Sequence, residues 1–295
     1  MSELLYTDRP ALRRPLLVAA FSGWNDAGDA ATSAVRFMQR RWRADIFATV
    51  DPEQFFDFTQ ARPLVRLRDG KRVIEWPSNT FAGHVLEDHE RDIILLNGTE
   101  PHLRWQHYVQ SILDVCEAFE VSGFITLAAL LAEASHTRPV RVTGSSTDDE
   151  LSRQLDLGRN TTSAYEGPTG IVGVLTQAIR ESGIPSASMW ANVPFYVQRS
   201  PNPKGSLALL ERLNRGLKLE LTLHDLEVFG ARFDAQVQSD IASNPEVAEL
   251  ARRFEEDEPD NLDVVDEGGE LPDPKAMVDE LERFLREQRD DSKDA

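Results

Sequence analysis

Short apolar runs alternate with helical patterns along most of the chain. Each run is continuous rather than alternating, which is typical of strands buried on both faces of a parallel sheet. The predicted strands are 15–21, 44–50, 92–98, 123–130, 140–146 and 188–193. Between them, apolar residues recur at three- and four-residue steps in 27–42, 105–119 and 171–179, which predicts helices with one buried face. This alternation predicts a three-layer α/β/α domain with a mostly parallel sheet.

Residues 62–84 interrupt the alternation. Two β-rich runs, "LVRLR" and "RVIEW", are joined through Asp69-Gly70, a dipeptide that favours a tight hairpin turn. Charged residues alternate with apolar ones in both runs. We therefore expect a hairpin that lies at a sheet edge or projects from it.

The pattern becomes helical after Pro203. Helical stretches cover 205–229, 233–258 and 273–290, and the residues around 257–272 form an acidic linker rich in Gly and Pro. We expect an α/β core domain at 1–225 and an acidic helical extension at 226–295.

The charge of the chain limits its partners. The 295 residues carry a net charge of −18, and residues 234–295 hold 21 Asp and Glu against 7 Lys and Arg. Nucleic acids and anionic membranes require clustered basic residues, so neither is expected as a partner. The single cysteine, Cys116, excludes an intrachain disulfide and is predicted to fill the core rather than act as a nucleophile. The apolar run near the N-terminus is too short for a signal peptide or a membrane span, which favours the cytoplasm.

The turn "GWNDAGDAA", residues 23–31, follows the first predicted strand and opens a helix. A turn in this place often binds phosphate, but Asp26 and Asp29 would repel an anion. Acids in the first helical turn can instead cap free N–H groups and complement the helix dipole. The alternative is a polar site that also uses Asn25.

Three further loops carry polar candidates: "NGTEPHLRW" (97–105), "SHTRP" (135–139) and "YEGPTGIVGVL" (165–175). The first two follow predicted parallel strands, so they should emerge at the carboxyl edge of the sheet, where α/β proteins bind ligands. His136 and Arg138 form either an acid–base pair or an ordinary exposed loop. The glycines of 165–175 either admit a ligand or only make room for packing.

The residues expected to form a shared cleft or a contact surface come from these four stretches. They are Trp24, Asn25, Asp26, Asp29, Glu100, Arg104, His136, Arg138, Glu166 and Thr169. Because Trp and Arg are favoured at protein contacts, the same turns can form an interface between subunits. No established catalytic motif or metal-ligand spacing accompanies them, so we predict no catalytic residue, metal or cofactor.

Seven motifs in order resemble the proteasome assembly chaperone 2 family, especially its bacterial, actinobacterial-type members. They span residues 12–225 and read "FSGWNDAGDAA", "DFTQARP", "EWP", "GTEPHLRW", "HTRPVRVTGSS", "YEGPTGIVGVL" and "WANVPFYV…PNPKGSLALLERL". The resemblance implies a phosphorylase/hydrolase-like, Rossmann-like fold. It also implies assembly with identical copies, for example as a trimer, and no established catalytic activity.

The resemblance also suggests proteasome subunits as partners. Eukaryotic members of the family escort α-type subunits of the core proteasome, and archaeal members engage the proteasome through a C-terminal hydrophobic–Tyr–any tail. This sequence ends "DDSKDA", so docking by such a tail is not expected. The leading hypothesis is a non-enzymatic assembly or scaffolding protein that acts as a homo-oligomer. The alternative is a small-molecule-binding protein, or a hydrolase- or phosphorylase-like enzyme, that uses the cleft at the carboxyl edge.

Overall fold

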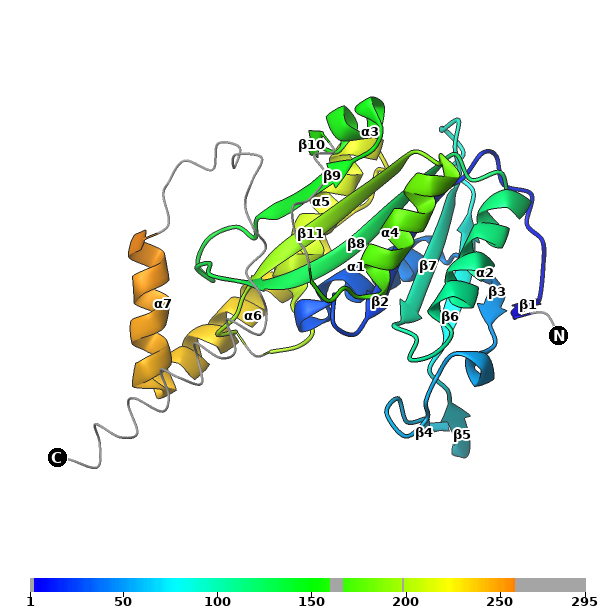
Figure 1. Cartoon of the computed structure of the whole chain (residues 1–295). Helices are drawn as coiled ribbons and strands as arrows, with labels where there is room; N and C mark the ends of the chain where they lie inside the picture. The colour runs from blue at the N-terminus through cyan, green and yellow to red at the C-terminus, as the bar shows by residue number, and fades with distance from the viewer. Residues whose placement is uncertain (1–2, 160–166, 198, 258–295) are drawn as a thin grey trace.

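A large twisted sheet forms the centre of the protein (Figure 1). The structure, a computed structural model, describes residues 3–159, 167–197 and 199–257. Within these residues the sheet has nine strands. From one edge to the other they are β1 (Leu4–Tyr6), β3 (Asp45–Val50), β6 (Asn79–His84), β7 (Ile93–Thr99), β2 (Leu16–Ser22), β8 (Gly123–Ala132), β11 (Ser186–Pro194), β9 (Val142–Ser146) and β10 (Gly158–Arg159).

All six predicted strands are present, and the predicted α/β fold is confirmed. The sheet is mixed. Strands β7, β2, β8 and β11 are parallel to one another, whereas β1, β3 and β6 pair antiparallel and β9 runs antiparallel to β11. For β6 and β7 the reason is the length of their connection, because a parallel neighbour requires a crossover of a dozen or more residues. Only residues 85–92 join β6 to β7, so the chain must reverse direction there.

Helices cover both faces of the sheet, which gives the three layers. One face packs against α1 (Ala30–Trp42), α5 (Pro203–Leu217) and the short α3 (Asp149–Gln154). The other face packs against α2 (Trp105–Ala118) and α4 (Ile171–Ser182). Strand β2 serves both layers, because Val18 contributes to the first apolar cluster and Leu17 to the second. This central position of β2 places the turn that follows it between the two layers.

The predicted hairpin is present and projects from the body (Figure 1). Strands β4 (Leu64–Arg68) and β5 (Lys71–Glu75) form a separate two-stranded antiparallel sheet. Its turn residues Asp69 and Gly70 both have positive φ, at 51° and 75°, as a tight hairpin turn requires.

Two helices follow α5. Helix α6 (His224–Ser243) runs from the body, and α7 (Pro245–Asp257) packs against it through a small apolar cluster that includes Phe233 and Val237. Among the described residues, no helix is both long enough and apolar enough to cross a membrane. The linker predicted around 257–272 and the helix predicted at 273–290 lie outside the described residues, apart from Asp257 itself.

Candidate functional site

The turn between β2 and α1 places Asp26 at the start of the helix. Its carboxylate accepts hydrogen bonds from the Ala31 backbone N–H (2.7 Å) and from the Thr32 hydroxyl (2.5 Å). The side chain therefore caps the N-terminus of α1, which is the first of the two roles that the sequence allowed. Asp26 is only 5% exposed, and this burial raises its pKa to about 6 although the hydrogen bonds from Thr32 and Ala31 act in the opposite direction.

Asp29 has a different role. It is the last residue of a short 3₁₀ turn, η1 (Ala27–Asp29), and makes no capping hydrogen bond to α1. Instead it accepts a hydrogen bond from the Ser200 hydroxyl, while the Asn202 backbone N–H donates to the carbonyl of Gly28 (2.7 Å). The turn is thereby attached to the segment that leads into α5.

Glu100 joins two elements at the carboxyl edge of the sheet. Its Oε1 accepts a hydrogen bond from the Ile171 backbone N–H at the start of α4 (2.7 Å), and its Oε2 accepts one from the Trp24 backbone N–H (3.4 Å). A Cβ placed at Gly170 would lie 2.0 Å from Asn25 Oδ1, so a larger residue there would displace the Asn25 side chain. Trp24, Asn25 and Glu100 therefore gather around the start of α4, next to the exposed Thr169.

A pocket of about 360 Å³ opens beside Glu100. Its lining residues come from the ends of β2 and β7 and the loops that follow, from the loop between η2 (Pro52–Gln54) and β4, and from the start of α2: Ser22, Gly23, Gln60, Thr99, Glu100, Pro101, His102 and Trp105. Glu100 is the only one of the predicted site residues among them. The others were missed because their importance depends on how the loops fold back onto one another. Among the described residues, no group of three His, Cys, Asp or Glu is arranged to hold a metal ion.

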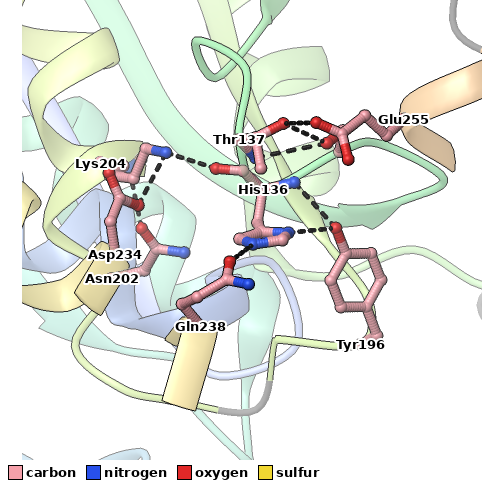
Figure 2. Close-up of polar contacts among 10 residues, drawn as sticks. His136, Thr137, Tyr196, Asn202, Lys204, Asp234, Gln238 and Glu255 are labelled. Atoms are coloured by element: carbon pink, nitrogen blue, oxygen red, sulfur yellow. Dashed lines mark hydrogen bonds and ion pairs between the residues drawn. The ribbon is translucent and has the colours of Figure 1, made fainter. Parts of the chain in front are cut away.

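His136, in the loop after β8, is held by other parts of the chain (Figure 2). Its Nδ1 lies 2.9 Å from the Tyr196 hydroxyl, which also accepts a hydrogen bond from the His136 backbone N–H (2.8 Å). Its Nε2 lies 3.3 Å from the amide oxygen of Gln238 on α6. With hydrogen on Nε2, the ring donates to Gln238 and accepts from Tyr196, so one tautomer satisfies both contacts.

The next residues of this loop contact α7. The Thr137 hydroxyl donates to the Glu255 carboxylate (3.1 Å), and the Arg138 guanidinium donates to the Glu255 backbone carbonyl (2.9 Å) (Figure 2 shows the first of these). The Phe254 ring lies parallel to the Tyr196 ring, with centroids 6.2 Å apart. The loop after β8 thus anchors the C-terminal helices, a role invisible in sequence because Tyr196, Gln238 and Glu255 are remote in the chain.

Arg104 lies neither with the residues around the start of α4 nor with those that contact α6 and α7. Its guanidinium forms an ion pair with Glu3 (2.8 Å), donates to Gln54 and lies over the ring of Phe55. These contacts tie the loop before α2 to the N-terminal segment.

The predicted residues lie along the carboxyl edge but in separate clusters rather than in the single cleft expected. Trp24, Asn25, Glu100 and Thr169 surround the start of α4, whereas His136 and Arg138 bind α6 and α7. Glu166 lies outside the described residues.

Comparison with known proteins identifies the family. The family model for the PAC2 family matches residues 20–240, three quarters of the chain. The chain belongs to the PAC2 family. A PAC2 family protein from Streptomyces avermitilis is 42% identical, with a TM-score of 0.71, and the match covers 80% of this chain and 99% of that one. A Mycobacterium tuberculosis proteasome-assembly chaperone homologue is 38% identical, with a TM-score of 0.70 and the same coverage.

More distant structures share the fold. An archaeal proteasome activator from Pyrococcus furiosus is 18% identical, with a TM-score of 0.65, over 80% of this chain and 97% of its own. Among curated proteins no match was found. The family match ends at residue 240, so α7, which binds Thr137 and Arg138, lies beyond the part shared with the PAC2 family model.

Proposed function

We propose that this PAC2 protein is a non-enzymatic assembly chaperone for proteasome subunits and acts as an oligomer of identical chains, such as a trimer. The observation that carries the proposal is the 38% identity to a proteasome-assembly chaperone homologue over 99% of that homologue's length. The α/β core at 1–225 performs the role, and the acidic extension at 226–295 is an addition to it. The cytoplasm is the proposed compartment, in keeping with a single buried cysteine.

The contacts of the polar residues favour this function over catalysis. Asp26 and Glu100 cap helices, and His136 links Tyr196 to Gln238. A catalytic acid or base must instead reach a bound substrate, directly or through one water. In this chain the same groups hold elements of the fold together.

The carboxyl edge also presents apolar side chains that suit a protein contact. Trp24, Leu103 and Leu131 follow or end three neighbouring parallel strands, and each is exposed over nearly half of its surface. Trp is enriched among the residues that dominate binding energy at interfaces. We therefore assign this rim to the contact between identical chains.

The test is capture of proteasome subunits by the tagged full-length protein in a host that has a proteasome. We expect α-type subunits to be enriched and, by light scattering, the mass of an oligomer. Trp24→Ser with Leu103→Ser should reduce the oligomer to monomer, whereas Val228→Ser, at an exposed apolar position on α6, should not. Absence of enriched subunits, together with normal proteasome assembly when the gene is deleted, would refute the chaperone role.

The pocket beside Glu100 supports a second candidate, the binding of a small molecule. Its volume of about 360 Å³ falls within the range of ligand sites, and it combines a carboxylate with the His102 imidazole and the Trp105 ring. Gln60 lines the pocket from a loop outside the sheet, so Gln60→Trp should reduce the volume of the pocket. Suppose that this variant captures subunits as well as the parent does but no longer binds a metabolite that co-purifies with the parent. That result would support small-molecule binding as a function of the pocket.

A further inference from the structure

Exposed apolar side chains gather on two separate surfaces of the protein. Among the described residues, fourteen large apolar side chains are exposed. Six of them belong to the β4–β5 hairpin and the residue that follows it. Three others form the rim of the carboxyl edge: Trp24, Leu103 and Leu131. Groups of exposed apolar side chains mark contact sites, so both surfaces are expected to be covered by a partner.

The hairpin has one apolar face that carries a single charge. The register pairs Val65 with Ile74 and Leu67 with Arg72, so the side chains of these four residues point to the same side. Trp76 continues this side beyond β5, and Leu67 is exposed to 74%. The apolar face thus consists of Val65, Leu67, Ile74 and Trp76, with Arg72 beside them. The other basic residues of the two strands lie on the opposite side: Arg66, Arg68 and Lys71.

The base of the apolar face is fixed to the core of the protein. The Trp76 ring packs edge-on against Phe58, with centroids 4.8 Å apart, and Phe58 in turn packs against the second apolar cluster. Beyond Trp76 the hairpin projects from the body (Figure 1). A two-stranded hairpin is at best marginally stable in water unless its apolar face packs against another element. Because the hairpin projects, that element can come from a neighbouring chain.

The rim surrounds a pocket with one uncovered carboxylate. Trp24 and Leu103 are the chain neighbours of Gly23 and His102, which line the pocket of about 360 Å³. The lining includes the carboxylate of Glu100 and, within the described residues, no Lys or Arg to neutralise it. A Cβ placed at Gly23 would lie 3.1 Å from Glu100 Oε2, so the glycine leaves this oxygen accessible from the pocket.

This pocket suits an arginine side chain. The two oxygens of Glu100 each accept one backbone N–H, and a carboxylate has about four acceptor sites, so Glu100 can still bind a cation. The Trp105 ring lines the same pocket and is held by a hydrogen bond from its Nε1 to the Pro101 carbonyl (2.6 Å). A guanidinium donates two parallel hydrogen bonds to a carboxylate and stacks on aromatic rings.

The hairpin and the rim are complementary rather than alike. The hairpin offers a projecting apolar face with one cation, and the rim offers apolar side chains around a recessed carboxylate. Two different surfaces that fit each other make a head-to-tail contact, which closes into a ring when the rotation between chains allows it. A contact between two hairpins would instead join only two chains and leave the rim exposed. The head-to-tail contact buries both surfaces at once.

We propose that the β4–β5 hairpin of each chain docks on the carboxyl-edge rim of the next identical chain. Arg72 enters the pocket of that chain and pairs with Glu100. The apolar face of the hairpin covers Trp24 and Leu103. The inference rests on the oligomer proposed above and adds which two surfaces join its chains. A small molecule in the pocket would compete with this contact.

Charge reversal on the two faces of the hairpin tests the contact. In the full chain, Arg72→Glu should raise the protein concentration at which half of the oligomer dissociates by at least about tenfold, because it places a second carboxylate against Glu100. Lys71→Glu makes the same change of charge at the neighbouring residue on the opposite face and should leave that concentration nearly unchanged. Light scattering on serial dilution measures both. Equal effects of the two variants would overturn the inference.

Mixing two variants tests the head-to-tail geometry. The hairpin variant carries Leu67→Ser with Arg72→Glu, and the rim variant carries Trp24→Ser with Leu103→Ser. Each should be monomeric alone. In the mixture, the intact hairpin of the rim variant meets the intact rim of the hairpin variant, so dimers of one chain each should form and grow no further. A mixture that stays monomeric contradicts the head-to-tail contact.

The same measurements separate this inference from the proposed function. If the parent is an oligomer and the hairpin variant is an oligomer of the same mass, the proposed oligomer stands and the hairpin contact is refuted. If the parent itself is monomeric, both are refuted. Leu67→Ser and Leu64→Ser provide a further matched pair without a change of charge, because both residues are exposed but lie on opposite faces of the hairpin. Only Leu67→Ser should weaken the oligomer.

Discussion

The buried carboxylate of Asp26 makes the stability of the protein depend on pH in an unusual direction. Burial raises its pKa to about 6, whereas an Asp in the unfolded chain titrates near its ordinary value of 3.8. Between these two values the folded state binds a proton that the unfolded state has released. The free energy of unfolding therefore falls as pH rises through this window, and the stabilisation is complete only below the unfolded value.

The magnitude follows from the shift. Each pKa unit corresponds to about 1.4 kcal/mol, so the ionised carboxylate destabilises the fold by about 3 kcal/mol at pH 7.5. Linkage leaves about half of that penalty at pH 5. Asp26→Asn removes the charge while its amide oxygen can still accept the hydrogen bond from the Ala31 N–H. We expect the variant to be more stable than the parent, by about 3 kcal/mol at pH 7.5 and by about 1.5 kcal/mol at pH 5.

Urea denaturation followed by tryptophan fluorescence measures both differences. Asp29→Asn is the matched control, because it neutralises a neighbouring acid that is not the buried cap. Burial is the largest cause of the raised pKa of Asp26 and the charge of Asp29 only a smaller one, so Asp29→Asn should reduce the pH dependence much less than Asp26→Asn does. If Asp26→Asn changes the free energy of unfolding equally at the two pH values, or lowers it at pH 7.5, the account of Asp26 as a buried charge is refuted.

Three further predictions concern groups that hold the fold. Asp92 is fully buried, and burial alone would raise its pKa. Hydrogen bonds from Arg13 and from the backbone nevertheless hold the pKa of Asp92 below its ordinary value. The stabilisation that Asp92 provides is therefore present at neutral pH and lost in acid. Asp92→Ala should lower the free energy of unfolding by about 2–4 kcal/mol at pH 7, and a loss that is as large at pH 3 contradicts this reasoning. Glu100→Ala should destabilise by about 1 kcal/mol through loss of the α4 cap, with Glu100→Gln close to the parent in the same denaturation assay. Tyr196→Phe removes both hydrogen bonds between Tyr196 and His136 and should speed amide exchange in α7, with the amides of α2, remote from this contact, as the control. Unchanged α7 exchange would show that the tyrosine hydroxyl does not anchor the helix.

Much of the architecture follows from the sequence pattern. Continuous apolar runs such as 15–21 identify strands buried on both faces, and the stripe in 171–179 identifies a helix that ends before Gly183. The direction of a strand, in contrast, does not follow from the apolar pattern. An apolar run has the same appearance in a parallel and an antiparallel neighbour, so β9 gave no sign that it runs against β11. Strand β6, "NTFAGH", was missed because its polar and glycine residues hide a strand that is stabilised mainly by its two neighbours.

The site, like the fold, could be predicted only in part from the sequence. Chain order correctly indicates that the loops after β2, β7 and β8 emerge at one edge, because parallel strands end there. It does not indicate which loops touch. Glu100 reaches the start of α4, while His136 is drawn to Tyr196 and α6, and both outcomes depend on where distant helices pack. Whether these clusters form a cleft or an interface stays a prediction.

Strand β1 is only three residues long, yet it covers the outer side of β3, pairing Leu4 with Val50 and Tyr6 with Ala48. Its position is secured by the ion pair between Glu3 and Arg104. The sheet margin is therefore sealed by the first few residues of the chain. Trimming them would leave a row of β3 amide and carbonyl groups, with the exposed Ile46 beside them, free to pair with another molecule and seed polymers. An affinity tag fused directly before β1 would put this pairing at risk.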